Sequence, residues 1–243
     1  MLLGCYHPKQ LRPFVLVHGA FGGGWYWQGI SRRLREHGHE VYAPTLTGLG
    51  ERSHLSHAGI DLSLHVEDVC AVLEWEDLRE VVLVGFSYGG MVIAGVADRM
   101  PERIRHLVYF DALVPLDGQS ANDLLATHET KAFTGETDWI DPAPALALHP
   151  VSADPAIRAW MERKLVRHPL RSFEEPIHFR DQARLDALPR TFIYCSDKLA
   201  ADDPSAIRVR TEPGWQYRTL ATTHYAMLSM PDEVTDLLME AGA

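Results

Sequence analysis

The sequence predicts an α/β protein with a mainly parallel sheet of about six strands, flanked by helices and carrying a helical cap insertion. Two observations lead to this prediction. Short apolar, β-branched runs alternate with segments of helical periodicity, which is typical of parallel strands joined by helical crossovers. The alternation is interrupted over residues 115–186 and then resumes, as expected for a unit inserted between two strands.

The first half of the chain shows three strands with helices between them. Gly38 is well placed to end the first helix, because glycine adopts the conformation that closes a helix C-terminus. Asp61 or Ser63 is expected to cap the second helix, whose apolar side chains recur on one face. The expected elements are a strand at 14–17, a helix at about 25–37, a strand at about 40–43, a loop at 47–60, a helix at about 62–76 and a strand at 81–84.

The second half adds three strands and the interruption. Residues 115–186 are rich in proline and in short amphipathic patterns, so we interpret them as a cap within a single domain that spans 1–243. Pro231 suits the first turn of the last helix. The large apolar side chains of the cap are candidates to wall a pocket: Phe133, Trp139, Trp160 and Phe173. The other expected elements are a helix at about 89–100 and strands at about 106–110, 191–195 and 217–220.

The bulk composition indicates a soluble globular protein. The formal net charge of −10 argues against a nucleic-acid partner, which needs clustered lysine and arginine. Three cysteines offer neither a disulfide framework nor a pair of metal ligands. No stretch approaches the roughly 20 apolar residues of a membrane helix, and residues 1–10 lack the apolar core of a signal peptide. These features predict a cytoplasmic protein that binds neither nucleic acid nor a membrane.

The strongest local signal is the motif Gly85-x-Ser87-x-Gly89. An apolar strand precedes it and a helical pattern follows it, which is the context of a nucleophile elbow. The turn is so tight that the residues flanking the serine must be small, and the serine hydroxyl projects above the edge of the sheet. The motif therefore predicts Ser87 as a nucleophile.

A serine hydroxyl needs a base to take its proton, and the base needs an acid to orient it. His224 follows the last expected strand, and Asp197 follows the strand before it. The order Ser87, Asp197, His224 is the order expected when a nucleophile elbow comes first in the chain. Asp111, directly after the strand at 106–110, is a rival acid that could instead cap the start of the cap segment. Two weaker rivals lie further along the loop after Asp197, namely Asp202 and Asp203.

An oxyanion formed at the substrate carbonyl also needs donors. The N–H of Tyr88, after the nucleophile, is one candidate, and the N–H of Ala20 in the glycine-rich loop 18–24 is the other. That loop lacks the G-x-G-x-x-G spacing of a dinucleotide site. His18 is expected to brace this loop. The spacing of three further histidines matches no common metal motif: His54, His57 and His65.

Several segments together resemble the hydroxynitrile lyase and plant methylesterase group of α/β-hydrolases, and its bacterial carboxylesterases most of all. The resemblance implies the α/β-hydrolase fold, no cofactor and often a homodimer. Position by position it supports the triad of Ser87, Asp197 and His224, with Ala20 and Tyr88 as oxyanion donors. The segments that carry it are FVLVHGAFGGGWYW at 14–27, APTLTGLGERS at 43–53, GFSYGG at 85–90, SDK at 196–198 and HYAML at 224–228.

Two departures from that group bear on the reaction. Its hydroxynitrile lyases carry threonine where this chain has Gly19, and lysine where it has Tyr225. Without the lysine charge that holds departing cyanide, the resemblance implies ester hydrolysis. The usual esterase residue at position 225 is methionine, so the substrate class stays open. We expect a serine carboxylic ester hydrolase for a small apolar or aromatic ester. The alternatives are a lyase or cyclase acting on a specialised metabolite, and a non-catalytic small-molecule receptor.

Overall fold

The computed structural model describes residues 11–125, 137–149, 154–197 and 204–243. Its main feature is a six-stranded sheet in the order β2-β1-β3-β4-β7-β8, and every neighbouring pair of strands is parallel. The predicted fold class and number of strands are therefore confirmed. The strands are β1 (Phe14–Val17), β2 (Val41–Tyr42), β3 (Val81–Phe86), β4 (Ile104–Phe110), β7 (Arg190–Cys195) and β8 (Trp215–Leu220).

Both faces of the sheet are covered, which explains why its central strands are apolar throughout. Every residue of β3 is buried. Along β1, Phe14 and Leu16 join the core on one face, and Val15 and Val17 join the core on the other. This alternation follows from the period of two of a strand, and it leaves no solvated face on β1.

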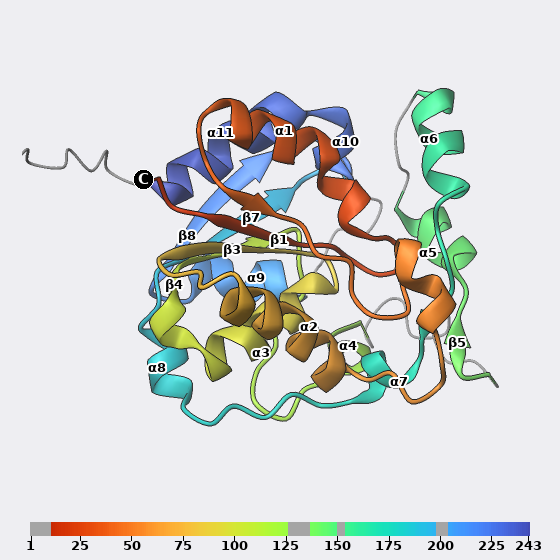
Figure 1. The fold of residues 1–243 in the computed structure, drawn as a ribbon, viewed down its shortest axis with the longest axis horizontal. Helices are drawn as coiled ribbons and strands as arrows, with labels where there is room; N and C mark the ends of the chain where they lie inside the picture. The colour runs from red at the N-terminus through yellow and green to blue at the C-terminus, as the bar shows by residue number, and fades with distance from the viewer. Residues whose placement is uncertain (1–10, 126–136, 150–153, 198–203) are drawn as a thin grey trace, which may run out of the picture.

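Helices α1 and α11 pack together on one face of the sheet, and α2 and α3 pack together on the other (Figure 1). Side chains of α9 join the same core as α2 and α3. None of the helices in the described part of the chain has the length and apolar composition of a membrane span. The helices outside the cap are η1 (Gly24–Trp27), α1 (Gln28–Glu36), η2 (Gly50–Leu55), α2 (Leu62–Trp75), α3 (Gly89–Arg99), η3 (Pro101–Arg103), α9 (Pro204–Thr211), α10 (Ala226–Ser229) and α11 (Pro231–Gly242).

The helix boundaries follow the local signals with a few differences. Asp61 caps α2, since its carboxylate accepts the Leu64 N–H at 3.0 Å. Gly38 follows α1 with a φ of 89°. The helix expected at 25–37 begins as the 3-10 turn η1, and the expected loop 47–60 contains η2. Helix α9 was not predicted, because its apolar residues are too few to mark a helix face.

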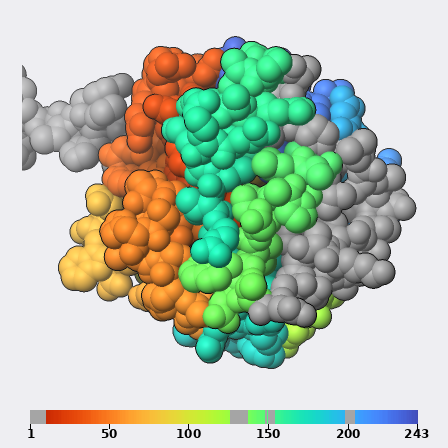
Figure 2. Space-filling view, turned by 90° about the vertical axis from the view of Figure 1, so that its right-hand side faces the viewer, coloured from red at the N-terminus to blue at the C-terminus, as the bar shows by residue number. Residues whose placement is uncertain are grey.

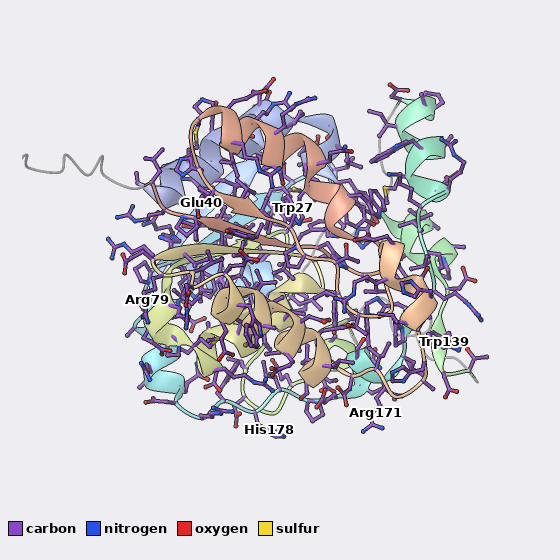
Figure 3. The ribbon with its side chains drawn as sticks, in the orientation of Figure 1. Trp27, Glu40, Arg79, Trp139, Arg171 and His178 are labelled. Atoms are coloured by element: carbon purple, nitrogen blue, oxygen red, sulfur yellow. The ribbon has the colours of Figure 1, made fainter. Side chains whose placement is uncertain are left out.

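The cap segment lies between β4 and β7. Most of it lies on the side of the sheet where the strands end, but its last helix, α8 (Gln182–Asp186), packs beside α3 at the opposite end (Figure 1). In Figure 3, Trp139 and Arg171 mark this side, and Glu40 and Arg79 lie at the opposite end. Figure 2 views the molecule from the cap side, and segments 137–149 and 154–175 spread over that face. Phe133 lies outside the described residues. The elements of the cap are α4 (Ala121–Leu125), β5 (Trp139–Ile140), α5 (Pro142–Leu148), α6 (Pro155–Glu162), β6 (His168–Pro169), α7 (Arg171–Glu174) and α8 (Gln182–Asp186).

Candidate active site

Ser87 lies on a sharp turn between β3 and α3, with a positive φ of 53°. A side chain at either flanking glycine would collide with backbone. A Cβ at Gly85 would lie 2.6 Å from the Gly89 carbonyl oxygen, and one at Gly89 would lie 2.8 Å from the Val17 carbonyl oxygen. The turn therefore has the strained backbone and the small neighbours of a nucleophile elbow.

Hydrogen bonds tie the Ser87 backbone to the end of the neighbouring strand. Its N–H donates to the Phe110 carbonyl oxygen at 3.3 Å, and its carbonyl oxygen accepts the Leu113 N–H at 3.1 Å. Because Phe86 pairs with Phe110 in the parallel register, Ser87 and Asp111 leave the sheet side by side. Helix α3 begins two residues beyond the serine, and the partial positive charge of its N-terminus favours negative charge there.

Asp111 and His224 form a buried pair beside this turn. His224 Nδ1 lies 2.5 Å from Asp111 Oδ2, and the carboxylate is fully buried. The other carboxylate oxygen, Oδ1, accepts the Cys195 N–H at 3.2 Å. Asp111 has a φ of 46°, a conformation that aspartate tolerates better than most residues. A carboxylate on Nδ1 holds the proton there and leaves Nε2 to act as a base.

Asp197, which we expected to orient His224, does not contact it in the structure. It lies two residues beyond β7 with an exposed side chain, and its N–H donates to the Thr222 carbonyl oxygen at 2.9 Å. This bond fixes the backbone while the carboxylate stays in solvent. The expected pairing is therefore corrected: the acid at His224 is Asp111, and it faces the histidine instead of capping the cap segment. Two weaker candidates lie outside the described residues: Asp202 and Asp203.

Aromatic rings pack around His224. Its ring centroid is 4.6 Å from that of Phe86 and 5.3 Å from that of Tyr225. The ring centroid of His149, which follows α5 in the cap, is 4.4 Å from that of His224. The sequence did not point to His149, because no motif surrounds it.

Within the described residues, Ser87 Oγ makes no hydrogen bond to His224. Catalytic hydrogen bonds of this kind are often long in the absence of substrate and shorten when substrate binds.

The candidate oxyanion donors lie on either side of the nucleophile. A Cβ at Gly19 would lie 3.0 Å from Ser87 Cβ, so the loop 18–24 is directly beside the serine. In the part of the chain that the structure describes, neither the Ala20 N–H nor the Tyr88 N–H donates to another protein atom. An oxyanion hole requires backbone donors that are not bonded to the protein, so both N–H groups stay candidates for that role.

His18 braces this loop, as the sequence predicted. Its Nε2 accepts the Leu46 N–H at 3.0 Å, so its proton is on Nδ1, which donates to the Gly19 carbonyl oxygen at 2.7 Å. Burial lowers the pKa of His18 to about 4. The ring is therefore neutral near pH 7, and both of its nitrogens are occupied.

A second group of buried side chains lies behind the elbow. The Tyr88 hydroxyl donates to His65 Nδ1 at 2.9 Å, while His65 Nε2 donates to the Thr47 carbonyl oxygen. From the cap, Phe173 stacks on Tyr88 at 5.0 Å and His168 packs at 4.9 Å. Burial lowers the pKa of both histidines and raises that of Tyr88. No three His, Cys, Asp or Glu side chains among the described residues form a metal-binding group.

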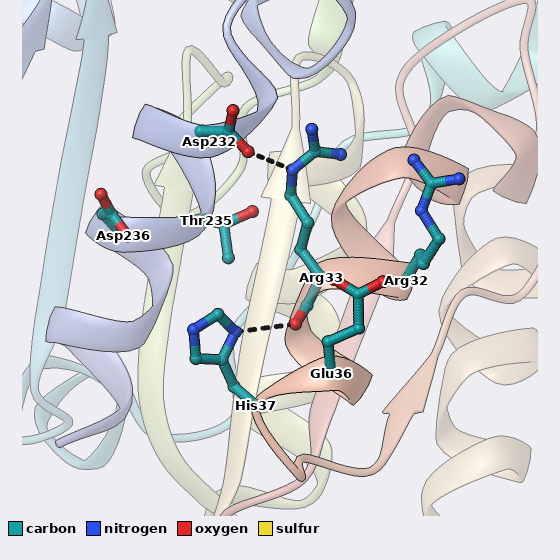
Figure 4. Close-up of a pocket in the computed structure, with 7 residues that line it drawn as sticks. All are labelled: Arg32, Arg33, Glu36, His37, Asp232, Thr235 and Asp236. Carbon is teal, nitrogen blue, oxygen red and sulfur yellow. Dashed lines mark hydrogen bonds and ion pairs between the residues drawn. The ribbon is translucent and has the colours of Figure 1, made fainter.

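A surface hollow between α1 and α11 is separate from this site (Figure 4). Its lining is charged, and the Arg33 guanidinium is paired with the Asp232 carboxylate across it. Since this hollow contains none of the predicted catalytic groups, we assign it no role in the chemistry. It is lined by Arg32, Arg33, Glu36, His37, Asp232, Thr235 and Asp236.

Several known proteins are similar to this chain. A model of the alpha/beta hydrolase family matches residues 14–237. A carbendazim hydrolyzing esterase of Nocardioides sp. (strain SG-4G) is 37% identical, over 94% of this chain and 99% of that protein. An alpha-hydroxynitrile lyase of Arabidopsis thaliana is 36% identical over 42% of this chain and 40% of that protein. An extracellular alpha/beta-hydrolase from a Paenibacillus species shares the fold, with a TM-score of 0.82, 24% identity and coverage of 95% of this chain and 99% of that one.

Proposed function

The chain belongs to the alpha/beta hydrolase family, and we propose that it is a serine carboxylic ester hydrolase acting on small apolar or aromatic esters. The class of ester hydrolase rests on the Nocardioides esterase, which is similar along 94% of this chain. The observation that carries the mechanism is the buried Asp111–His224 pair beside the Ser87 elbow. We assign Ser87 as nucleophile, His224 as base and Asp111 as the orienting acid.

Acylation begins when Ser87 Oγ attacks the carbonyl carbon of the ester. His224 Nε2 takes the hydroxyl proton, and Asp111 stabilises the imidazolium that forms. The carbonyl oxygen becomes an oxyanion, which the N–H groups of Ala20 and Tyr88 bind. Each such donor contributes about 2.7–4 kcal/mol in comparable sites. The tetrahedral intermediate then breaks the bond to the alcohol oxygen, which leaves with the proton from His224.

Deacylation repeats these steps with water. His224 Nε2 removes a proton from a water molecule, and the resulting oxygen attacks the acyl carbon. The same two N–H groups bind the second oxyanion. Collapse of the intermediate breaks the bond to Ser87 Oγ, which recovers its proton from His224, and the carboxylic acid leaves. The triad and the two N–H groups thus complete one ester hydrolysis, and each returns to its starting protonation state.

The two positions that distinguish lyases in this group argue for hydrolysis. A Cβ at Gly19 would lie 2.9 Å from the buried Phe86 ring, so this loop has no room for the threonine of the lyases. Tyr225 is buried, with its ring 6.0 Å from that of Tyr26. Its neutral phenol cannot supply the ammonium charge with which the resemblance associates cyanide release.

The apolar or aromatic substrate is proposed from the rings around the pair. Phe86, Tyr225 and His149 surround His224, and Phe173 of the cap stacks on Tyr88. Rings of this kind bury flat or apolar groups at little cost in conformational entropy. An ester panel should therefore span short acyl chains, aryl esters and methyl esters. Carbendazim, the compound named for the Nocardioides relative, belongs in the same panel.

The proposal is tested by Ser87→Ala, with hydrolysis and fluorophosphonate labelling as the two measurements. We expect covalent labelling of the native protein at Ser87 and none in the variant. We expect kcat to fall on the order of 10⁶-fold, because the triad acts as a unit. Ser53→Ala, at an exposed serine, is the matched control and should keep full activity. Undiminished hydrolysis by Ser87→Ala would overturn the assignment.

A further inference from the structure

The loop that carries Ala20 contains a strained turn. Phe21 has a φ of 65°, which is uncommon for an aromatic residue. Across it, the Gly22 N–H donates to the Ala20 carbonyl oxygen at 2.8 Å. A three-residue turn with a positive φ at its centre is the rare and strained form of the γ-turn. Such a conformation persists only where the surrounding structure holds it.

The cap holds Phe21 in this conformation by two hydrogen bonds. The Phe21 carbonyl oxygen accepts the Val166 N–H at 3.0 Å, and the Phe21 N–H donates to His168 Nδ1 at 3.3 Å. The two rings also pack edge to face, with centroids 5.7 Å apart. Both polar backbone groups of Phe21 are therefore bonded to one segment of the cap, residues 166–168.

The cap makes a second contact just beyond this loop, at η1. Lys164 Nζ lies 5.3 Å from the ring of Trp25 in η1 and 4.5 Å from the ring of Trp160 in α6. The two indole rings meet edge to face at 5.1 Å. This cation–π contact holds the cap segment against η1, which follows the strained turn.

The hydrogen bonds of His168 determine which ring nitrogen carries the proton. Nδ1 accepts the Phe21 N–H, so the proton is on Nε2, which donates to Ser172 Oγ at 2.9 Å. Ser172 Oγ in turn donates to the Pro169 carbonyl oxygen at 2.9 Å. Each group in this chain has one donor and one acceptor role, and the neutral ring fits it without an unpaired nitrogen. His168 is fully buried and cannot exchange these partners for water.

We propose that His168 is a positioning residue for the oxyanion hole: by accepting the Phe21 N–H, it holds the strained turn that directs the Ala20 N–H at the reacting carbonyl oxygen. The inference deepens the proposed function and rests on it, since it takes Ala20 as an oxyanion donor. The cap segment 166–168 then does more than cover the site. The Ala20 N–H has the correct direction only while this segment stays bonded to Phe21.

The test compares three replacements that differ in where they place an acceptor. His168→Leu removes it. His168→Asn puts an amide oxygen close to the place of Nδ1, and His168→Gln puts one closer to the place of Nε2. Complete removal of one oxyanion donor costs about 10²–10³-fold in kcat. A donor that is only misdirected should cost less, so we expect a loss of about 10–100-fold for His168→Leu, with KM changed by less than about threefold.

A ligand that mimics the oxyanion separates positioning from general loss of structure. Trifluoromethyl ketones add to the serine and place a charged oxygen in the oxyanion hole. Their inhibition constant should rise in His168→Leu by the same factor as kcat falls. His168→Asn should recover more of kcat than His168→Gln. His106→Leu is the matched control: it also removes a buried histidine, bonded to Thr191, and should leave kcat unchanged even where the melting temperature falls.

The outcomes distinguish this inference from the proposed function. If native protein hydrolyses esters and is labelled at Ser87 but folded His168→Leu keeps its kcat, the inference is wrong and the function stands. If His168→Leu does not fold, the test is the comparison of kcat between His168→Asn and His168→Gln. Equal kcat values, or a higher kcat for His168→Gln, would refute the inference. If native protein is neither labelled nor active, the proposed function itself fails.

Discussion

The choice between Asp111 and Asp197 can be decided by one pair of matched variants. In Asp111→Asn, the Cys195 N–H still needs an acceptor, so the amide oxygen should occupy the place of Oδ1, 3.2 Å from that nitrogen. The amide NH₂ would then face His224 Nδ1 and donate to it, in place of the carboxylate oxygen at 2.5 Å. The imidazole proton is thereby forced onto Nε2, and the ring cannot accept the serine proton.

The expected loss follows from this change of tautomer. An equivalent replacement in a serine protease triad lowers kcat by about 10⁴-fold, which corresponds to about 5.4 kcal/mol of transition-state stabilisation at about 1.36 kcal/mol per tenfold. Asp197→Asn alters an exposed side chain that does not contact His224. Surface changes of this kind usually alter stability by less than about 0.5 kcal/mol, and we expect kcat within about threefold of the native value.

The assay is steady-state hydrolysis of a p-nitrophenyl ester near pH 8, with melting temperatures to show that both variants fold. The near-isosteric amide keeps the Cys195 bond, so Asp111→Asn should stay folded while it loses activity. The reverse result, with Asp197→Asn inactive and Asp111→Asn close to native, would show that the acid acts from the loop after β7 and that the pairing of Asp111 is structural.

Two further predictions concern the loop and its buried histidines. Gly19→Ala should lower kcat and destabilise the protein by about 1–3 kcal/mol, because the new Cβ would press on Phe86 and Ser87. The control is Gly29→Ala, whose Cβ has ordinary space near Arg33, and equal urea stabilities for the two would contradict the steric argument. Burial lowers the pKa of His18 from 6.5 in the unfolded chain to about 4 in the folded protein. Between these values the unfolded chain binds more protons, so the free energy of unfolding should fall as the pH drops through this window. His18 alone should lower the free energy of unfolding by about 2 kcal/mol at pH 5. His65 and His168 should lower it further, because burial lowers their pKa values too. A urea midpoint that is constant from pH 8 to pH 5 would refute this prediction.

The sequence was sufficient for the sheet, because its signals are local. A short, valine-rich apolar run such as Val81–Phe86 is typical of a strand that is covered on both faces, and it is too short for a buried helix. The elbow at Ser87 was equally evident, since close backbone approach leaves Gly85 and Gly89 no alternative. A local pattern determines where a strand lies in the chain and which residues of a turn must be small, and both features were predicted.

The parts of the site that were not predicted depend on contacts between distant segments. Phe21 and His168 are 147 positions apart, and no pattern within the cap indicates that this histidine will accept a backbone N–H from the loop after β1. The same holds for His149 beside His224. The preference for Asp197 came from chain order and resemblance, which describe where an acid usually follows a strand but not where its carboxylate points.

The backbone around Asp111 accounts for the contact of this carboxylate, and not of one from the neighbouring loop, with His224. The residue after β3 and the residue after β4 both have positive φ values, 53° at Ser87 and 46° at Asp111, so the chain bends the same way at two adjacent strand ends. At Asp111 this bend directs the carboxylate across the end of β7, where Oδ1 takes the Cys195 N–H. The position from which an acid after β7 would reach His224 Nδ1 is thus already filled. An aspartate directly after a strand is the one sequence signal for this arrangement, because aspartate tolerates the left-handed conformation that the bend requires.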